Sequence, residues 1–168
     1  MTALEKHRPR VATVMDYECE NQFSEVMSWA EEAARWCELV VIIPKVPGTI
    51  GCIPDRVNGA DVVLGYSVPT AYGGTAVPVW EFGRRPIHLL GGSPQKQLDL
   101  ARYLNVVSAD GNMAHQQAHR GRFWGRKKGP KGHWRQLSET GDTRVEGANL
   151  EAFRMSLAEI SEAWGKRV

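Results

Sequence analysis

Two segments of this chain place carboxylates directly after an apolar run. Asp16 and Glu18 flank Tyr17 at the end of the first run, and Asp110 follows the run 105–109. The carboxyl ends of parallel strands are where α/β proteins place their chemistry. A carboxylate presented there can act as a nucleophile or a general base, which makes Asp110 the candidate catalytic residue. Asp-Gly-Asn is also an ordinary turn sequence, which is the alternative.

The Asp16-Tyr17-Glu18 segment has the side chains that a purine site needs. Two carboxylates can bind the Watson–Crick edge of a purine while an aromatic ring stacks on it. The alternative is that both carboxylates cap the following helix near its positive end. Lys45 follows the next apolar run and can contact a phosphate, and an ordinary exposed lysine is the alternative.

Two glycine-bearing segments complete the candidate site. Gly65 and Tyr66 offer a close backbone approach and a stacking face, or else a turn glycine and a half-buried tyrosine. The turn Gly91-Gly92-Ser93 precedes a predicted helix, whose free N–H groups and dipole favour an anion. We expect phosphate binding at Gly91, Gly92 and Ser93, with an ordinary capped turn as the alternative.

The segment from Gly111 to Ser138 concentrates positive charge. It holds seven Lys/Arg and no Asp or Glu, so the rest of the chain has 14 basic against 19 acidic residues. Cations interleaved with aromatic rings are typical of nucleic-acid binding, and a solvated loop is the alternative. The residues predicted to contact nucleic acid are Arg120, Arg122, Trp124, Arg126, Lys127, Lys128, Lys131 and Arg135.

His115 and His119 lie four residues apart and can share one helix face, as metal ligands do. No nearby Cys or Glu completes a zinc set. The spacing therefore favours a helix that turns polar groups toward phosphate, and we predict neither a metal site nor a cofactor.

Five short apolar runs predict the strands that position these residues. The runs are mostly continuous rather than alternating, which is typical of strands covered on both faces. The predicted strands are Val11–Met15, Leu39–Pro44, Asp61–Tyr66, Pro86–Leu90 and Asn105–Ala109. The predicted helices are Asn21 to Cys37, Pro94 to about Tyr103, and Asn149 to Trp164.

This order of elements favours an α/β fold with a parallel sheet of about five strands. Five strands cannot close an eight-stranded barrel. The sheet is therefore open, or it is part of a (β/α)8 barrel that another chain completes. We predict one domain, 1–168, with a core at 11–110, a basic segment at 111–138 and a C-terminal helix at 149–165.

The composition is that of a soluble globular protein, with 42% apolar and 24% charged residues among 168. No apolar run approaches the length of a membrane span, and the N-terminal residues show no secretory signal. The three cysteines are Cys19, Cys37 and Cys52, which leave one unpaired in any disulfide scheme. We therefore expect a reducing, cytoplasmic compartment and no membrane partner.

The order of these motifs resembles the second half of the tRNA-guanine transglycosylase barrel, including the phage enzymes that place 7-deazaguanines in DNA. The similarity covers roughly Val11 to Gly121. It is carried by four segments in order: Met15-Asp16-Tyr17-Glu18-Cys19, Val63-Leu64-Gly65-Tyr66, His88-Leu89-Leu90-Gly91-Gly92-Ser93-Pro94, and Asp110 with Ala118-His119-Arg120-Gly121.

The resemblance implies a function and a set of roles. Asp110 would attack the sugar C1′ and expel guanine, giving a covalent intermediate that a 7-deazaguanine resolves. Asp16 or Glu18 would read the incoming base, although matching Glu-Cys to Glu18-Cys19 puts Tyr17 at that position. Gly65 and Tyr66 would line the base pocket.

The sequence also departs from the family pattern. The first half of the barrel, with its general acid/base aspartate, and the Cys/His zinc site have no counterpart here. Met113-Ala114-His115 stands where the family has Pro-Thr-Arg. These departures leave three alternatives: a chain that pairs with itself or a second subunit, a non-catalytic nucleic-acid-binding subunit, and an enzyme for nucleotides or sugar phosphates.

Overall fold

The structure is a computed structural model that describes residues 3–71, 73–126, 131–137 and 148–166. It divides the chain into two compact units. The first spans Met1–Leu90 and Ala101–Asp110, and the second spans Gly91–Leu100 and Gly111–Val168. The predicted core at 11–110 therefore corresponds to the first unit, except that residues 91–100 belong to the second.

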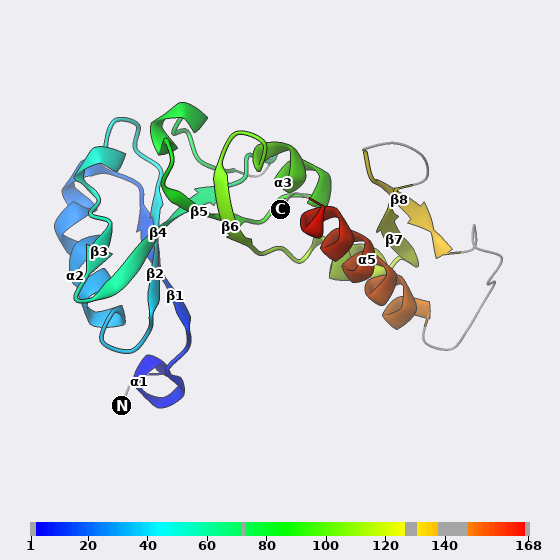
Figure 1. Cartoon of the computed structure of the whole chain (residues 1–168), viewed down its shortest axis with the longest axis horizontal. Helices are drawn as coiled ribbons and strands as arrows, with labels where there is room; N and C mark the ends of the chain where they lie inside the picture. Colours follow the sequence, from blue (N-terminus) through cyan, green and yellow to red (C-terminus); the bar gives the residue numbers. More distant parts are fainter. Residues whose placement is uncertain (1–2, 72, 127–130, 138–147, 167–168) are drawn as a thin grey trace. The chain divides into compact units, whose positions relative to one another are not determined.

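A mostly parallel sheet forms the first unit, which confirms the predicted α/β fold class. Its parallel strands are β1 (Val11–Tyr17), β2 (Leu39–Pro44), β4 (Ala60–Ser67), β5 (Pro86–Leu90) and β6 (Asn105–Ala109). They lie in the order β1-β2-β4-β5-β6 (Figure 1). A two-residue strand, β3 (Arg56–Val57), pairs antiparallel with β4, and the apolar pattern does not predict it.

Helix α2 (Phe23–Ala33) covers one face of this sheet (Figure 1). Residues paired across a parallel sheet point to the same face, so Tyr17, opposite Pro44, shares a face with Ile42. The Tyr17 ring packs against Phe23 at the start of α2, with ring centroids 5.7 Å apart. The side of α2 that is buried consists of Val26, Ala30 and Ala33.

The other face carries a row of residues that crosses all five parallel strands. In the register, Asp16 lies opposite Ile43, Gly65 opposite His88, and His88 opposite Ser108. Ile43 and Gly65 are also neighbours, because a Cβ atom at Gly65 would lie 2.6 Å from Cγ1 of Ile43. The row therefore brings three polar side chains to the face opposite α2.

The helices differ from the sequence prediction mainly at their ends. The helix predicted from Asn21 to Cys37 consists of a 3₁₀ turn, η1 (Glu20–Gln22), and α2. After Ala33 the α-helical pattern stops, and Trp36 N–H donates to Ala33 O at 2.9 Å. The other short elements of the first unit are α1 (Ala3–His7), η2 (Ile50–Cys52) and η3 (Val79–Phe82).

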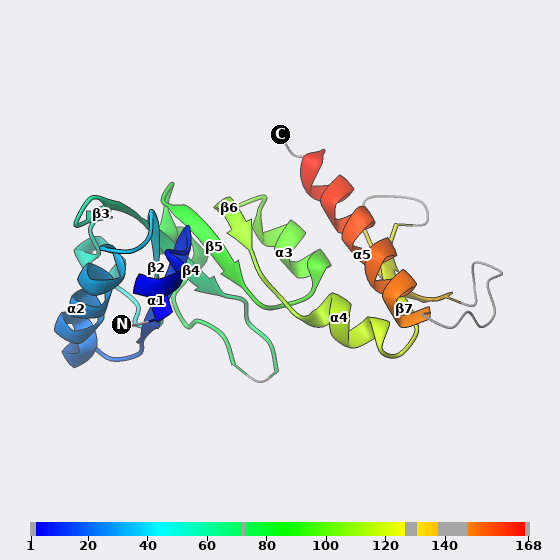
Figure 2. The ribbon, with the colours of Figure 1, turned by 90° about the horizontal axis from the view of Figure 1, so that it is seen from below.

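The second unit is built around the C-terminal helix α5 (Ala148–Gly165). This helix packs against an antiparallel hairpin of β7 (Arg122–Gly125) and β8 (His133–Gln136), and against α4 (Met113–Ala118). Figure 2 shows α5 beside β7 and α4. The predicted basic segment therefore contains a helix and a hairpin rather than only a loop.

Side chains from separate segments form the core of the second unit. Helix α3 (Pro94–Leu100) contributes Leu98, which packs with Trp124 and Ala163. The buried hydroxyl of Ser156 accepts a hydrogen bond from Trp124 N–H at 2.9 Å and donates to Ala152 O at 3.0 Å. These contacts fix α5 against the hairpin. In the part of the chain that the structure describes, no helix has the length and apolar character to cross a bilayer.

Candidate functional site

Asp110 lies at the carboxyl edge of the sheet, directly after β6. Its backbone N–H donates to Leu89 O at 2.9 Å, which continues the pairing of β6 with β5. The Asp110 side chain is 56% exposed, and Oδ2 lies 3.6 Å from Nε2 of His88. The predicted nucleophile is therefore presented to solvent beside an imidazole ring.

His88 connects Asp110 to Ser108 through its two ring nitrogens. Nδ1 lies 2.8 Å from Ser108 Oγ, while Nε2 faces Asp110. The His88 side chain is only 13% exposed, whereas Ser108 lies on the exposed edge strand. A carboxylate beside Nε2 favours the tautomer that carries its proton there, so in the neutral ring the Ser108 hydroxyl donates to Nδ1.

Asp16 and Glu18, the predicted base-reading residues, both face Lys45. Lys45 Nζ forms an ion pair with Asp16 and lies 3.5 Å from Oε1 of Glu18. The hydrogen bond with Asp16, supported by the charges of both carboxylates, raises the pKa of Lys45. The predicted contact of Lys45 with phosphate stays a prediction, because its ammonium group is here engaged by two carboxylates.

The Asp16 and Asp110 clusters lie at opposite edges of the sheet. Asp16 belongs to β1 and Asp110 follows β6, with three strands between them in the sheet order. Neighbouring strands lie about 4.8 Å apart, so an open sheet separates these edges by roughly 19 Å. One nucleobase is too small to touch both carboxylates at that separation.

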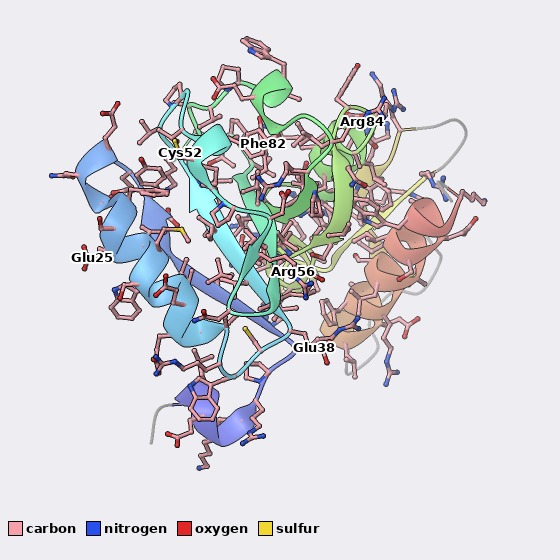
Figure 3. All side chains as sticks on the ribbon, turned by 60° about the vertical axis from the view of Figure 1, so that its left-hand side comes forward. Glu25, Glu38, Cys52, Arg56, Phe82 and Arg84 are labelled. Carbon is pink, nitrogen blue, oxygen red and sulfur yellow. The ribbon has the colours of Figure 1, made fainter. Side chains whose placement is uncertain are left out.

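Tyr17 and Tyr66 do not present the stacking faces that the sequence predicts. Their side chains point to the covered face of the sheet, and their exposed fractions are 3% and 4%. Tyr66 packs edge-on against Phe82 of η3, with ring centroids 5.1 Å apart, and burial raises the pKa of its hydroxyl. Figure 3 labels Phe82, the last residue of η3. Both tyrosines are core residues in this structure.

Gly65 is buried in the middle of the row on the face opposite α2. A Cβ atom there would lie 2.6 Å from Ile43 Cγ1 and 2.8 Å from Leu90 Cδ1. Those two side chains use the space that glycine leaves. The structure thus gives Gly65 a packing role, and its predicted place in a base pocket stays a prediction.

The Gly91-Gly92-Ser93 turn precedes α3 in the second unit. Both glycines have positive φ values, 68° and 79°, a conformation that favours glycine. The turn is stabilised internally, because the Gln97 side chain donates to Gly91 O at 2.8 Å and Lys96 N–H donates to Ser93 Oγ at 3.4 Å. These contacts agree with the capped-turn alternative, and the phosphate site stays a prediction.

The basic residues of the second unit differ in their exposure to solvent and in their contacts. Arg120, Arg122 and Lys131 are exposed. Arg126 is engaged by two carboxylates of α5, Glu159 at 4.0 Å and Glu162 at 3.6 Å. Arg135 lies over the Phe123 ring, 5.1 Å from its centroid. Lys127 and Lys128 lie outside the described residues.

The prediction that Trp124 stacks on bases is wrong for this structure. Trp124 is 1% exposed and packs with Leu98 and Ala163 in the core of the second unit. In strand β7, which contributes to the mixture of aromatic and basic residues in this segment, Arg122 is exposed while Phe123 and Trp124 are buried.

His115 of α4 and His119, the C-cap residue that follows this helix, lie side by side, as their spacing predicts. Their Nε2 atoms lie 3.2 Å apart, and both side chains are exposed. Among the described residues, no group of three or more His, Cys, Asp or Glu side chains is arranged to hold a metal ion. The pair alone therefore makes an incomplete ligand set.

A comparison with known protein families identifies the family of this chain. A model described as "Family of unknown function (DUF6610)" matches residues 1–165. The chain belongs to this family. No curated protein and no solved structure gives a significant match to it.

For this DUF6610 chain, sequence reasoning missed His88 and Ser108 as site residues. The available signal was a polar residue inside each of two apolar strands, Pro86–Leu90 and Asn105–Ala109. Only the strand register, which sets His88 opposite Ser108, shows that the two side chains meet.

Proposed function

We propose that this DUF6610 protein exchanges a guanine base in DNA or tRNA for a 7-deazaguanine. The observation that carries the proposal is the exposed carboxylate of Asp110, held at the carboxyl edge of a parallel sheet beside His88. The motif order that resembles guanine transglycosylases supports it independently. The reaction needs no cofactor.

In the proposed reaction, an oxygen of Asp110 attacks the sugar C1′ as the bond to guanine breaks. The covalent aspartyl-sugar intermediate is then resolved when N9 of the incoming base attacks C1′ and releases the carboxylate. Oδ2 of Asp110 lies 3.6 Å from Nε2 of His88. Exposed cations of the second unit, Arg120, Arg122 and Lys131, hold the polymer backbone.

We further propose that the five-stranded sheet works as part of a barrel that a second copy or another subunit completes. Asp16 and Asp110 lie at opposite edges of the open sheet, too far apart to serve one base. The polar row with Asp16, His88 and Ser108 lies on the face opposite α2. In a (β/α)8 barrel the face without helices is the interior.

The test is incorporation of labelled guanine into duplex DNA and into tRNA, comparing the native protein with Asp110→Ala. We expect incorporation into one polymer by the native protein and none by the variant, with polymer binding retained by both. Equal incorporation by the two proteins would refute Asp110 as the nucleophile.

A non-catalytic nucleic-acid-binding or partner subunit is the second candidate. The Lys45 ion pair, which neutralises the base-reading carboxylate Asp16, favours it. Native protein whose affinity for the polymer falls steeply with salt, but which incorporates no base, would support this second function.

A further inference from the structure

The side chains around His88 form a path for a proton. The imidazole is largely buried, Asp110 lies on its Nε2 side, and Ser108 lies on its Nδ1 side. Ser108 is exposed on the edge strand, so its hydroxyl can meet a bound molecule. A largely buried ring that contacts an exposed carboxylate on one side and an exposed hydroxyl on the other is suited to pass a proton between these groups.

Base exchange at C1′ needs such a proton. A guanine that departs from the sugar carries the electron pair of the broken bond, and it leaves readily only when it gains a proton. The Nε2 atom itself is poorly placed to give one, because it lies 3.6 Å from the attacking carboxylate. Acid and nucleophile that flank one glycosidic bond stand about 5–5.5 Å apart in retaining enzymes.

We propose that His88 and Ser108 form a proton relay for the departing and the incoming base, an inference that rests on the proposed base exchange. In the first step, the bond from Asp110 to C1′ forms and the bond from C1′ to guanine breaks. The Ser108 hydroxyl gives its proton to the leaving base and takes one from Nδ1 of protonated His88, which becomes neutral.

The second step returns the proton. N9 of the incoming base attacks C1′, its N–H proton passes through Ser108 to Nδ1 of His88, and the Asp110 carboxylate leaves. His88 therefore gives up its proton when the intermediate forms and regains it when the intermediate is resolved.

A change of leaving group tests the relay. The substrates are DNA and tRNA labelled with guanine or with 7-methylguanine, which leaves as a neutral base without gaining a proton. The measurement is base release in a single turnover with the protein in excess, corrected for release without protein. The variants are His88→Gln, Ser108→Ala and Asp110→Ala, with His7→Gln and Ser28→Ala at exposed positions as matched controls.

We expect His88→Gln and Ser108→Ala to slow guanine release by about 100-fold, the scale of general acid catalysis, and to leave 7-methylguanine release nearly native. Asp110→Ala should abolish both. Equal losses on both bases, or no loss on either, would overturn the relay while the proposed exchange stands. No release of either base by native protein, or release that Asp110→Ala does not reduce, would overturn the proposed exchange and the relay with it.

Discussion

At the scale of single residues, Lys45 controls the charge at the end of β1. Its ammonium group is held by Asp16 and by Glu18, so a ligand that needs a free carboxylate at Asp16 must compete with the lysine. The same pairing raises the pKa of Lys45 in the folded protein. The interaction therefore leaves a signature in the pH dependence of stability.

The pair should stabilise the fold below the unfolded-state pKa of lysine and lose this effect as the pH rises through the higher folded-state value. We expect native protein to lose about 0.5–1 kcal/mol more than Lys45→Met between pH 7 and pH 11, because both side chains are partly exposed. Urea unfolding of both proteins at each pH measures this difference. Identical losses would show that the pair contributes nothing to stability.

At the scale of elements, β4 depends on a glycine at its centre. The side chains of Ile43 and Leu90 occupy the space where a Cβ at Gly65 would lie. Side chains of β2 and β5 therefore pack together across β4 on the face opposite α2.

Gly65→Ala should therefore destabilise the first unit by about 1–3 kcal/mol, as other overpacking substitutions do. Gly51→Ala is the matched control, because a Cβ atom at Gly51 meets nothing within 4 Å. Thermal and urea unfolding measure both. A Gly65→Ala variant as stable as native protein would show that the row is loosely packed and has room for a ligand.

The parallel strands could be predicted because each is a mostly apolar run between turn residues, and β2, β5 and β6 have the predicted bounds. The end of α2 at Ala33 could not, since no glycine or proline marks it. The register between β5 and β6 could not be predicted either. The contact between His88 and Ser108 depends on this register, so the sequence did not reveal it. Trp124 was misassigned because a strand with a basic residue exposed and aromatic residues in the core mixes the two types in the same way as a nucleic-acid-binding segment.

At the scale of the whole molecule, the net charge of +2 does not show how accessible each basic residue is to a polyanion. Arg122 is exposed on β7, whereas Arg126 has only 20% of its side chain exposed and faces Glu159 and Glu162. The two arginines therefore form a natural comparison.

Arg122→Gln should weaken binding to duplex DNA and reduce the slope of log affinity against log salt by about 0.9, the value for one lost phosphate contact. Arg126→Gln should change the slope less, because Arg126 already has acidic partners. Fluorescence anisotropy titrations between low and moderate salt give both slopes. A larger effect at Arg126 would mean that its carboxylate partners are displaced when DNA binds.

The interleaving of the two units has a mechanical consequence. The polypeptide passes from one unit to the other three times, after Leu90, Leu100 and Asp110. His88 lies two residues before the first passage, and Asp110 is the last residue before the third. A load applied to the second unit is therefore transmitted along the main chain to β5, which holds His88, and to Asp110 at the end of β6.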